Sequence, residues 1–116
     1  MADVEVKVNK TIEPNSLSDG FTFTSASSGD VIKVFHDGKD TQTTYIVTST
    51  AGCNITIKAG DSLQAVNDEV VAVKAGKYHA FSIDSGRFLN IRGENAGKVL
   101  LVPDAACSIA VVETRV

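Results

Sequence analysis

Turn-forming residues interrupt this chain about every ten positions, and this spacing constrains its fold more than any other feature of the sequence. Asp37-Gly38, Gly60-Asp61, Ala75-Gly76 and Pro103-Asp104 are among the clearest of these signals. The runs between them are short, and none shows a convincing apolar repeat of 3.6 residues. The spacing therefore predicts a succession of short strands, and Asp37-Gly38 in particular marks a hairpin.

The composition favours the same kind of fold. The 116 residues include 15 Val, 8 Ile and 10 Thr but only 5 Leu. Side chains branched at Cβ pack well on a pleated surface, whereas helices favour leucine. We therefore expect a single all-β domain with less than about a tenth of its residues in helix. A domain of this length can bury a core without disulfides or a metal.

The expected architecture is an antiparallel β-sandwich with a jelly-roll-like strand order. Its strands are predicted at residues 21–24, 31–36, 43–48, 53–58, 69–73, 77–84, 87–92, 98–102 and 105–113. Before them, Val4, Val6 and Val8 alternate with polar residues, as in a half-buried strand or an extended arm lying on a surface. The predicted organisation is an N-terminal arm and linker over 1–20 and a sandwich domain over 21–116.

The titratable residues form no recognisable catalytic or metal-binding set. His36 and His79 have no second histidine, cysteine or carboxylate at metal-ligand spacing. Asp37 and Asp40 could line a cation site in a loop, although a solvated Asp-Gly turn explains them better. The sequence also lacks a nucleophile elbow and a phosphate-binding loop. We therefore predict no catalytic residues, no metal, no cofactor and no enzymatic activity.

Cys53 and Cys107 are the only cysteines. Because the chain shows no secretory signal, we expect two reduced, buried thiols, and each stands at the start of a β run where a small apolar side chain fits. The sequence has no run of about 18 apolar residues and no basic patch at its net charge of −3. We therefore expect neither a membrane nor a nucleic-acid partner.

The C-terminal third carries the strongest positive feature. Residues 99–102 are apolar on both faces of a strand, and 105–112 are apolar except for Ser108. Continuous apolarity indicates that both faces are covered, by a neighbouring subunit, by the N-terminal arm or by loops. Arg87 is expected to be structural or interfacial, with an exposed solubilising role as the alternative. The candidate interface residues are Val4, Val6, Val8, Arg87, Phe88, Val99, Leu101, Ile109 and Val111.

Four stretches of the sequence together resemble a known class of proteins. They are Ile-Thr-Ile-Lys-Ala-Gly-Asp at 55–61, Ser-Gly-Arg-Phe at 85–88, Gly-Lys-Val at 97–99 and Ala-Val-Val-Glu at 110–113. Over residues 53–113 the chain resembles the capsid decoration, or head-accessory, proteins of tailed bacteriophages. The resemblance implies a homo-oligomer, often a trimer, that sits on the outer capsid and cements neighbouring capsomers, with no catalytic residues.

The expected function is therefore that of a non-enzymatic virion structural protein. It would be made in the host cytoplasm, reside on the capsid surface, and have itself and the major capsid protein as partners. The alternative is a ligand- or carbohydrate-binding β-sandwich module of a phage tail or fibre protein. Sugars stack on exposed aromatic rings, and the chain has no Trp and only Tyr45 and Tyr78. A cupin-type enzyme would need a cluster of His and carboxylate ligands, which the sequence lacks.

Overall fold

The computed structural model describes residues 2–10, 17, 20–63 and 67–114. Its elements in chain order are β1 (Asp3–Val6), β2 (Val8–Lys10), β3 (Thr24–Ala26), β4 (Val31–Phe35), β5 (Thr43–Thr48), β6 (Cys53–Ile57), β7 (Glu69–Val73), β8 (Tyr78–Phe81), α1 (Ser85–Phe88), the 3-10 turn η1 (Gly93–Asn95), β9 (Lys98–Pro103) and β10 (Cys107–Glu113). Strands make up 47% of the described residues and helix 7%, which confirms the predicted all-β class.

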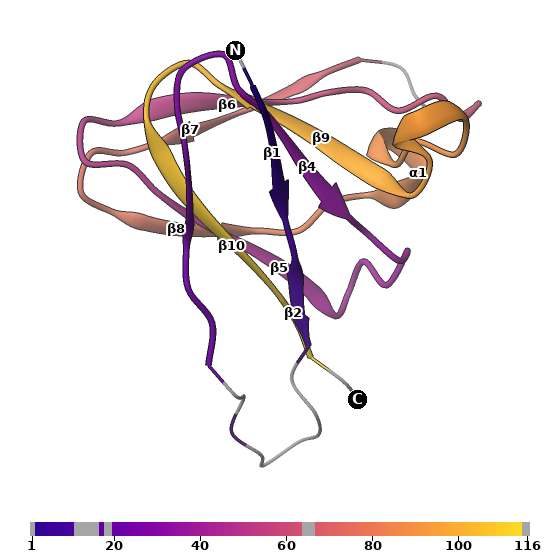
Figure 1. The fold of residues 1–116 in the computed structure, drawn as a ribbon, viewed down its shortest axis with the longest axis horizontal. Coiled ribbons are helices and arrows are strands. Elements are labelled where there is room, and N and C mark those ends of the chain that lie inside the picture. The colour runs from indigo at the N-terminus through magenta and orange to yellow at the C-terminus, as the bar shows by residue number, and fades with distance from the viewer. Residues whose placement is uncertain (1, 11–16, 18–19, 64–66, 115–116) are drawn as a thin grey trace.

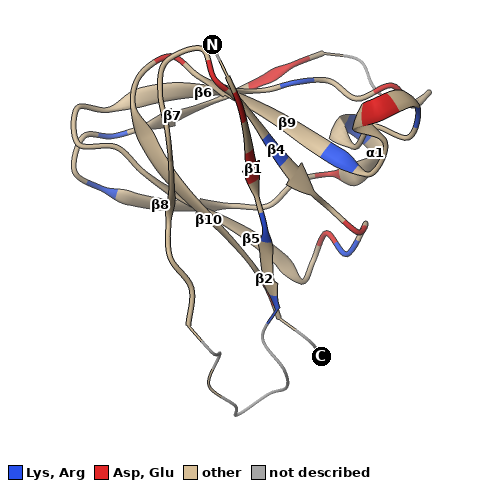
Figure 2. Ribbon diagram, in the orientation of Figure 1, with Lys and Arg blue, Asp and Glu red and all other residues tan. Residues whose placement is uncertain are grey.

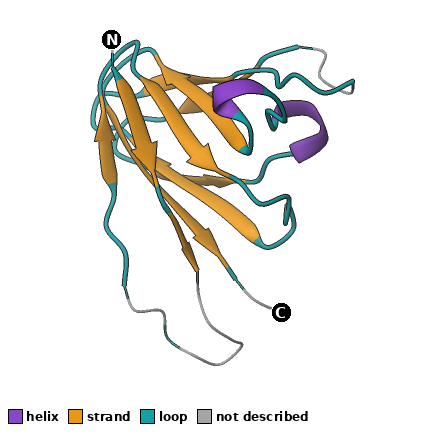
Figure 3. Cartoon of the chain, turned by 45° about the vertical axis from the view of Figure 1, so that its right-hand side comes forward, coloured by secondary structure: helices purple, strands orange, loops and turns teal. Residues whose placement is uncertain are grey.

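The strands form two sheets that pack face to face as a sandwich (Figure 1, Figure 3). The first sheet has the order β1-β4-β9-β6-β7, and the second has the order β2-β10-β5-β8. β3 also belongs to the second sheet, where it pairs with the beginning of β10 while β2 pairs with its end. The sandwich is therefore confirmed, whereas its jelly-roll character stays a prediction.

Most turns carry the chain from one sheet to the other. β4 lies in the first sheet and β5 in the second, so the predicted hairpin at Asp37-Gly38 is wrong. Gly38 has a φ of +86°, which glycine adopts readily, but its turn connects the two layers. Among the described strand pairings, β6 with β7 is the one between consecutive strands. Turn residues mark where a strand ends without specifying which sheet takes the next strand.

The N-terminal segment is built into both sheets. β1 runs parallel to β4, with Val4 opposite Ile32, and β2 runs parallel to β10, with Val8 opposite Val111. The two parallel pairs correct the expectation of a purely antiparallel sandwich. They also show that residues 3–10 belong to the sandwich, rather than forming an arm outside it (Figure 1). Most of the predicted linker over 11–20 lies outside the described residues.

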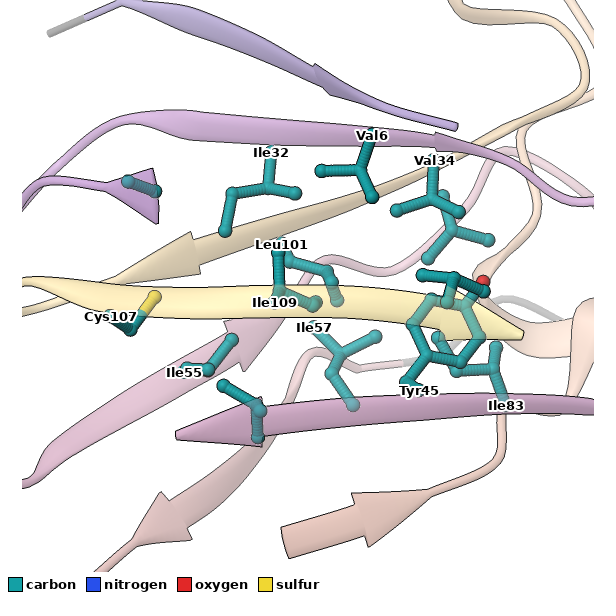
Figure 4. Packing of buried hydrophobic residues seen from close by; sticks show 14 of the residues in the cluster. Val6, Ile32, Val34, Tyr45, Ile55, Ile57, Ile83, Leu101, Cys107 and Ile109 are labelled. Carbon is teal, nitrogen blue, oxygen red and sulfur yellow. The ribbon is translucent and has the colours of Figure 1, made fainter. Parts of the chain in front are cut away.

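The core lies between the sheets and follows the alternation of the strands. Every second side chain of β4, β9 and β6 meets every second side chain of β5 and β10 (Figure 4). The fully buried apolar residues include Ile32, Val34, Tyr45, Val47, Ile55, Val99, Leu101, Pro103, Ile109 and Val111. The core is thus largely aliphatic, as expected from the excess of Val and Ile.

A helical turn replaces the strand predicted at 87–92. The Asp84 side chain accepts a hydrogen bond from the Gly86 N–H at 2.9 Å and caps α1. α1 then directs Phe88 into the core, where it is buried. Asn90, also buried, donates its side-chain N–H to the Lys98 carbonyl at 3.0 Å. The capping residue, which the apolar alternation does not reveal, decides the local structure here.

Candidate functional site

One end of the sandwich interior holds a buried polar cluster around His36, whose side chain has no exposed surface. His36 Nδ1 lies 2.9 Å from the Tyr45 hydroxyl, and Nε2 lies 2.8 Å from Asp40 Oδ1. Asp40 Oδ2 accepts hydrogen bonds from the backbone N–H and the hydroxyl of Ser85, both at 3.1 Å. The cluster therefore ties the end of β4 and the following loop to β5 and to the start of α1.

The arrangement is structural rather than nucleophilic. Ser85 donates to Asp40, whereas a serine nucleophile needs a base such as His36 in contact with its hydroxyl. Both ring nitrogens of His36 are already engaged in the interior. Desolvation acts to raise the pKa of Asp40, but hydrogen bonds from His36 and Ser85 outweigh it and lower that pKa below its ordinary value. The ionised carboxylate is the form that holds the cluster together.

Asp37 and Asp40, the pair considered for a loop cation, have separate partners. Asp37 and Glu113, a core-facing residue of β10 that is only 1% exposed, shift each other's pKa: the pKa of Asp37 is lowered and that of Glu113 is raised. Lys10 Nζ lies 3.7 Å from Asp37 and 3.9 Å from Glu113, and Lys39 Nζ lies 3.9 Å from Glu113. Within the described part of the chain, no group of three or more His, Cys, Asp or Glu residues could hold a metal ion.

We expect Glu113→Gln to increase the free energy of unfolding at pH 7. Burial and the contact with Asp37 raise the pKa of Glu113 above its ordinary value of 4.5. A carboxyl whose pKa is higher in the folded than in the unfolded protein stabilises the fold at pH values below its unfolded-state pKa. This stabilisation is lost as the pH rises through its folded-state pKa. Glutamine resembles the protonated acid and avoids that loss.

Urea denaturation of the wild type and of Glu113→Gln from pH 4 to pH 8 measures the effect. The difference in the free energy of unfolding between Glu113→Gln and the wild type should grow with pH and disappear near pH 4. A variant that is less stable than the wild type at pH 7 would show that the ion pairs with Lys10 and Lys39 outweigh the burial of charge.

Six of the nine candidate interface residues face the core, so their assignment to an interface is wrong for the chain as folded. They are Val6, Phe88, Val99, Leu101, Ile109 and Val111, all less than 5% exposed. Val4 and Val8 are half-buried and pack against the same core. These side chains are covered by the opposite sheet, so no partner is needed to bury them.

Arg87 is the one candidate with a charged group at the surface. Its guanidinium lies 4.8 Å from the centroid of the Phe88 ring, and Nη2 is 3.8 Å from Glu69 Oε2. The side chain is 39% exposed, so solvent weakens this ion pair. These contacts bind α1 to β7 within the chain, and an interfacial role for Arg87 stays a prediction.

The outer face of the second sheet carries no charge on its described strands. The strand registers place ten side chains on this face: Asn9, Ser25, Thr44, Ile46, Thr48, Tyr78, Ala80, Ser108, Ala110 and Val112. None is ionisable near neutral pH, although charged residues make up 22% of the chain. In Figure 2, β5 and β10 are almost entirely tan. We call this surface the uncharged face.

Aromatic rings from opposite edges meet over the uncharged face. Phe23 directly precedes β3 at one edge, and Tyr78 begins β8 at the other. Their ring centroids are 5.8 Å apart in an edge-to-face arrangement, and Phe21 lies 6.3 Å from Phe23. Ala110, which points outward from β10, is only 1% exposed. Tyr78 itself is 69% exposed, so the aromatic group covers part of the sheet and still presents apolar area to solvent.

The outer face of the first sheet is different because ion pairs cross its edges. Lys33 pairs with Asp3 at 3.1 Å, and Lys58 pairs with Asp68 at 2.9 Å. Figure 2 shows acidic residues on β1 and basic residues on β4 and β9. Val70, on the edge strand β7 of this sheet, is 56% exposed. Charged residues are depleted from the centres of protein interfaces and aromatic residues are enriched there, so the uncharged face is the better candidate for a contact surface.

The sequence located this surface only in part. The apolar run at 105–112, interrupted only by Ser108, predicts that both faces of this strand are covered: Ile109 faces the core, and on the outer side Ala110 is buried whereas Ser108 and Val112 are half-buried. Phe21, Phe23 and Tyr78 were not assigned to any site. The Phe-Thr-Phe alternation and the absence of charge at every second position of 44–48 and 108–112 were the available signals.

Comparison with known proteins adds no assignment. No protein-family model, no curated protein and no solved structure matches the chain. In the described residues, no helix has the length and apolarity required to cross a lipid bilayer.

Proposed function

We propose that this chain is a non-enzymatic structural protein of a phage virion, which forms a homo-oligomer and binds the outer surface of the capsid. The uncharged face, with Tyr78 and Phe21 exposed at its edges, is the observation that carries the proposal. The resemblance of residues 53–113 to capsid decoration proteins supports it. The clustered His36, Asp40 and Ser85 do not compete with it, because the His36 side chain has no exposed surface and the Ser85 hydroxyl donates to Asp40 rather than to a base.

The second candidate is a carbohydrate-binding module of a tail or fibre protein. The aromatic group at Phe21, Phe23 and Tyr78 favours it, since sugars stack on exposed rings. However, adjacent rings are inclined by 51° and 68°, so they do not form one flat platform. A contact surface for another protein accommodates such inclined rings more readily than a sugar ring does.

We expect Tyr78→Asp to dissociate the oligomer while leaving the fold intact. A buried tyrosine at an interface is commonly worth about 2 kcal/mol or more, which corresponds to a roughly 30-fold loss of affinity. Val70→Asp is the matched control, because Val70 is also an exposed apolar residue on an edge strand but lies in the first sheet. Light scattering coupled to size-exclusion chromatography would measure the mass of each protein.

The wild type and Val70→Asp should have the mass of a trimer, and Tyr78→Asp that of a monomer with an unchanged circular dichroism spectrum. Co-sedimentation with phage heads stripped of accessory proteins then tests capsid binding, and a glycan array tests the second candidate. A wild type that is monomeric at high micromolar concentration would refute the oligomer.

A further inference from the structure

The two cysteines face each other across the sandwich. Cys53 begins β6 in the first sheet, Cys107 begins β10 in the second, and both are buried members of one core cluster. Next to them, the Asn54 N–H donates to Asp104 Oδ1 at 2.8 Å, and the Asp104 N–H donates to the Asn54 carbonyl at 3.0 Å. These bonds hold the start of β6 against the segment that leads into β10.

A second hydrogen bond brackets the pair from the other side. The Ser49 hydroxyl donates to the Ala106 carbonyl at 2.7 Å, directly before Cys107. Each thiol influences the pKa of the other, as expected for two neighbouring groups in one core cluster. Sheets of a sandwich lie about 10 Å apart, and facing cysteines bridge this distance as a disulfide in immunoglobulin domains. The placement of Cys53 and Cys107 thus matches a known way of joining two sheets.

A pocket gives small reagents access to one of the two thiols. It has a volume of about 240 Å³ and lies where β3 and β5 end and β10 begins. Cys107 contributes to its wall, and most of the other lining residues carry hydroxyls, including Ser25, Thr48 and Ser108. Cys53 is not part of the wall, so a reagent in the pocket meets Cys107 first.

We propose that Cys53 and Cys107 form a modification site, at which a small-molecule disulfide entering the pocket converts the two thiols into a disulfide between the sheets. Cys107 Sγ attacks one sulfur of the reagent, forms a mixed disulfide and expels the other half as a thiol. Cys53 Sγ then attacks Cys107 Sγ and expels the second half. The protein loses two protons and two electrons, and the reagent gains them as two thiols.

The site is built for slow oxidation. Burial, and to a smaller extent the neighbouring Cys53, raises the pKa of Cys107 to about 11. Burial also raises the pKa of Cys53. The thiolate is the attacking species, so the rate should increase roughly tenfold per pH unit between pH 7 and pH 9. The disulfide would close a loop of about half the chain and restrict the unfolded state. This inference does not depend on the proposed function.

The test exposes the folded wild-type protein to oxidised glutathione and follows the product by intact mass and by thiol titration in denaturant. We expect a monomer that has lost two hydrogens, has no titratable thiol and melts roughly 10 °C higher than the reduced protein. Two thiols that persist after prolonged exposure at pH 9, or a disulfide that forms only between chains, would overturn the proposal.

Single substitutions test the route separately from the product. Cys53→Ser should retain one glutathionyl group on Cys107, because the resolving thiol is missing. Cys107→Ser should stay unmodified under the same conditions, because Cys53 does not reach the pocket. The reverse pattern would show that the reagent enters elsewhere. Thermal melts of both reduced variants establish that each is folded before it is exposed to the reagent.

Discussion

Ile109→Asp should abolish cooperative folding. Ile109 is fully buried at the centre of β10, which contacts β5 along one edge and β3 and β2 along the other. Its side chain points between the sheets among apolar neighbours (Figure 4). A carboxylate there has no partner, and its burial costs more than about 4 kcal/mol, a large share of the stability of a domain of this size.

Ser108→Asp is the matched control for this prediction, because it places the same carboxylate one residue away on the outward side of β10. Ser108 is half-buried and shares a weak contact of 3.5 Å with the Ser25 hydroxyl. This variant should keep the wild-type far-ultraviolet circular dichroism and lose at most about 1 kcal/mol. Urea denaturation compares the three proteins. A wild-type midpoint for Ile109→Asp would mean that the strand faces are assigned the wrong way round.

Gly60→Ala should be the most damaging substitution of a single methyl group. Gly60 follows β6, and its N–H donates to the Arg87 carbonyl of α1 at 2.9 Å. A Cβ at this position would lie 2.9 Å from the carbonyl carbon of Leu89 and even closer to its oxygen. Both atoms belong to the backbone, so no side-chain rotation can relieve the clash. We expect a loss of about 3 kcal/mol or more as α1 is displaced from the sheet.

Gly76→Ala separates this steric effect from the general cost of replacing glycine. Gly76 has a φ of +71°, and an added Cβ there would meet open space. Its replacement should cost only about 1 kcal/mol, the strain of a left-handed conformation. Thermal melts of both variants measure the two stability losses. Equal stability losses for Gly60→Ala and Gly76→Ala would contradict the close approach of α1 to the 58–61 turn.

The strands themselves could be predicted because their signals are local. Val4 and Val6, or Ile55 and Ile57, alternate with polar residues, and this alternation is a property of one strand with one buried face. Eight of the nine strands predicted from residue 21 onward overlap an observed strand, although 21–24 reaches β3 by only one residue. The exception, 87–92, failed because the Asp84 cap competes with the strand pattern at short range.

The partners of the strands could not be predicted from the same signals. Asp37-Gly38 has the composition of a hairpin turn, yet it joins β4 in one sheet to β5 in the other. The parallel pairing of β1 with β4 joins segments about 28 residues apart, and β2 pairs with β10 across most of the chain. Such pairings depend on how the apolar faces of all strands combine into one core.

For the candidate surface, too, some properties could be predicted from the sequence and others depended on the tertiary structure. The sequence alone determined that this protein is an all-β domain, that residues 105–112 are apolar on both strand faces except at Ser108, and that its two histidines lack ligand spacing. Those properties follow from local side-chain chemistry and strand period. Only the tertiary structure decided that Ile109 and Val111 face inward, that Phe23 and Tyr78 meet over the uncharged face, and that Cys53 lies opposite Cys107. The reason is physical: a strand has two equivalent faces until a second sheet packs against one of them.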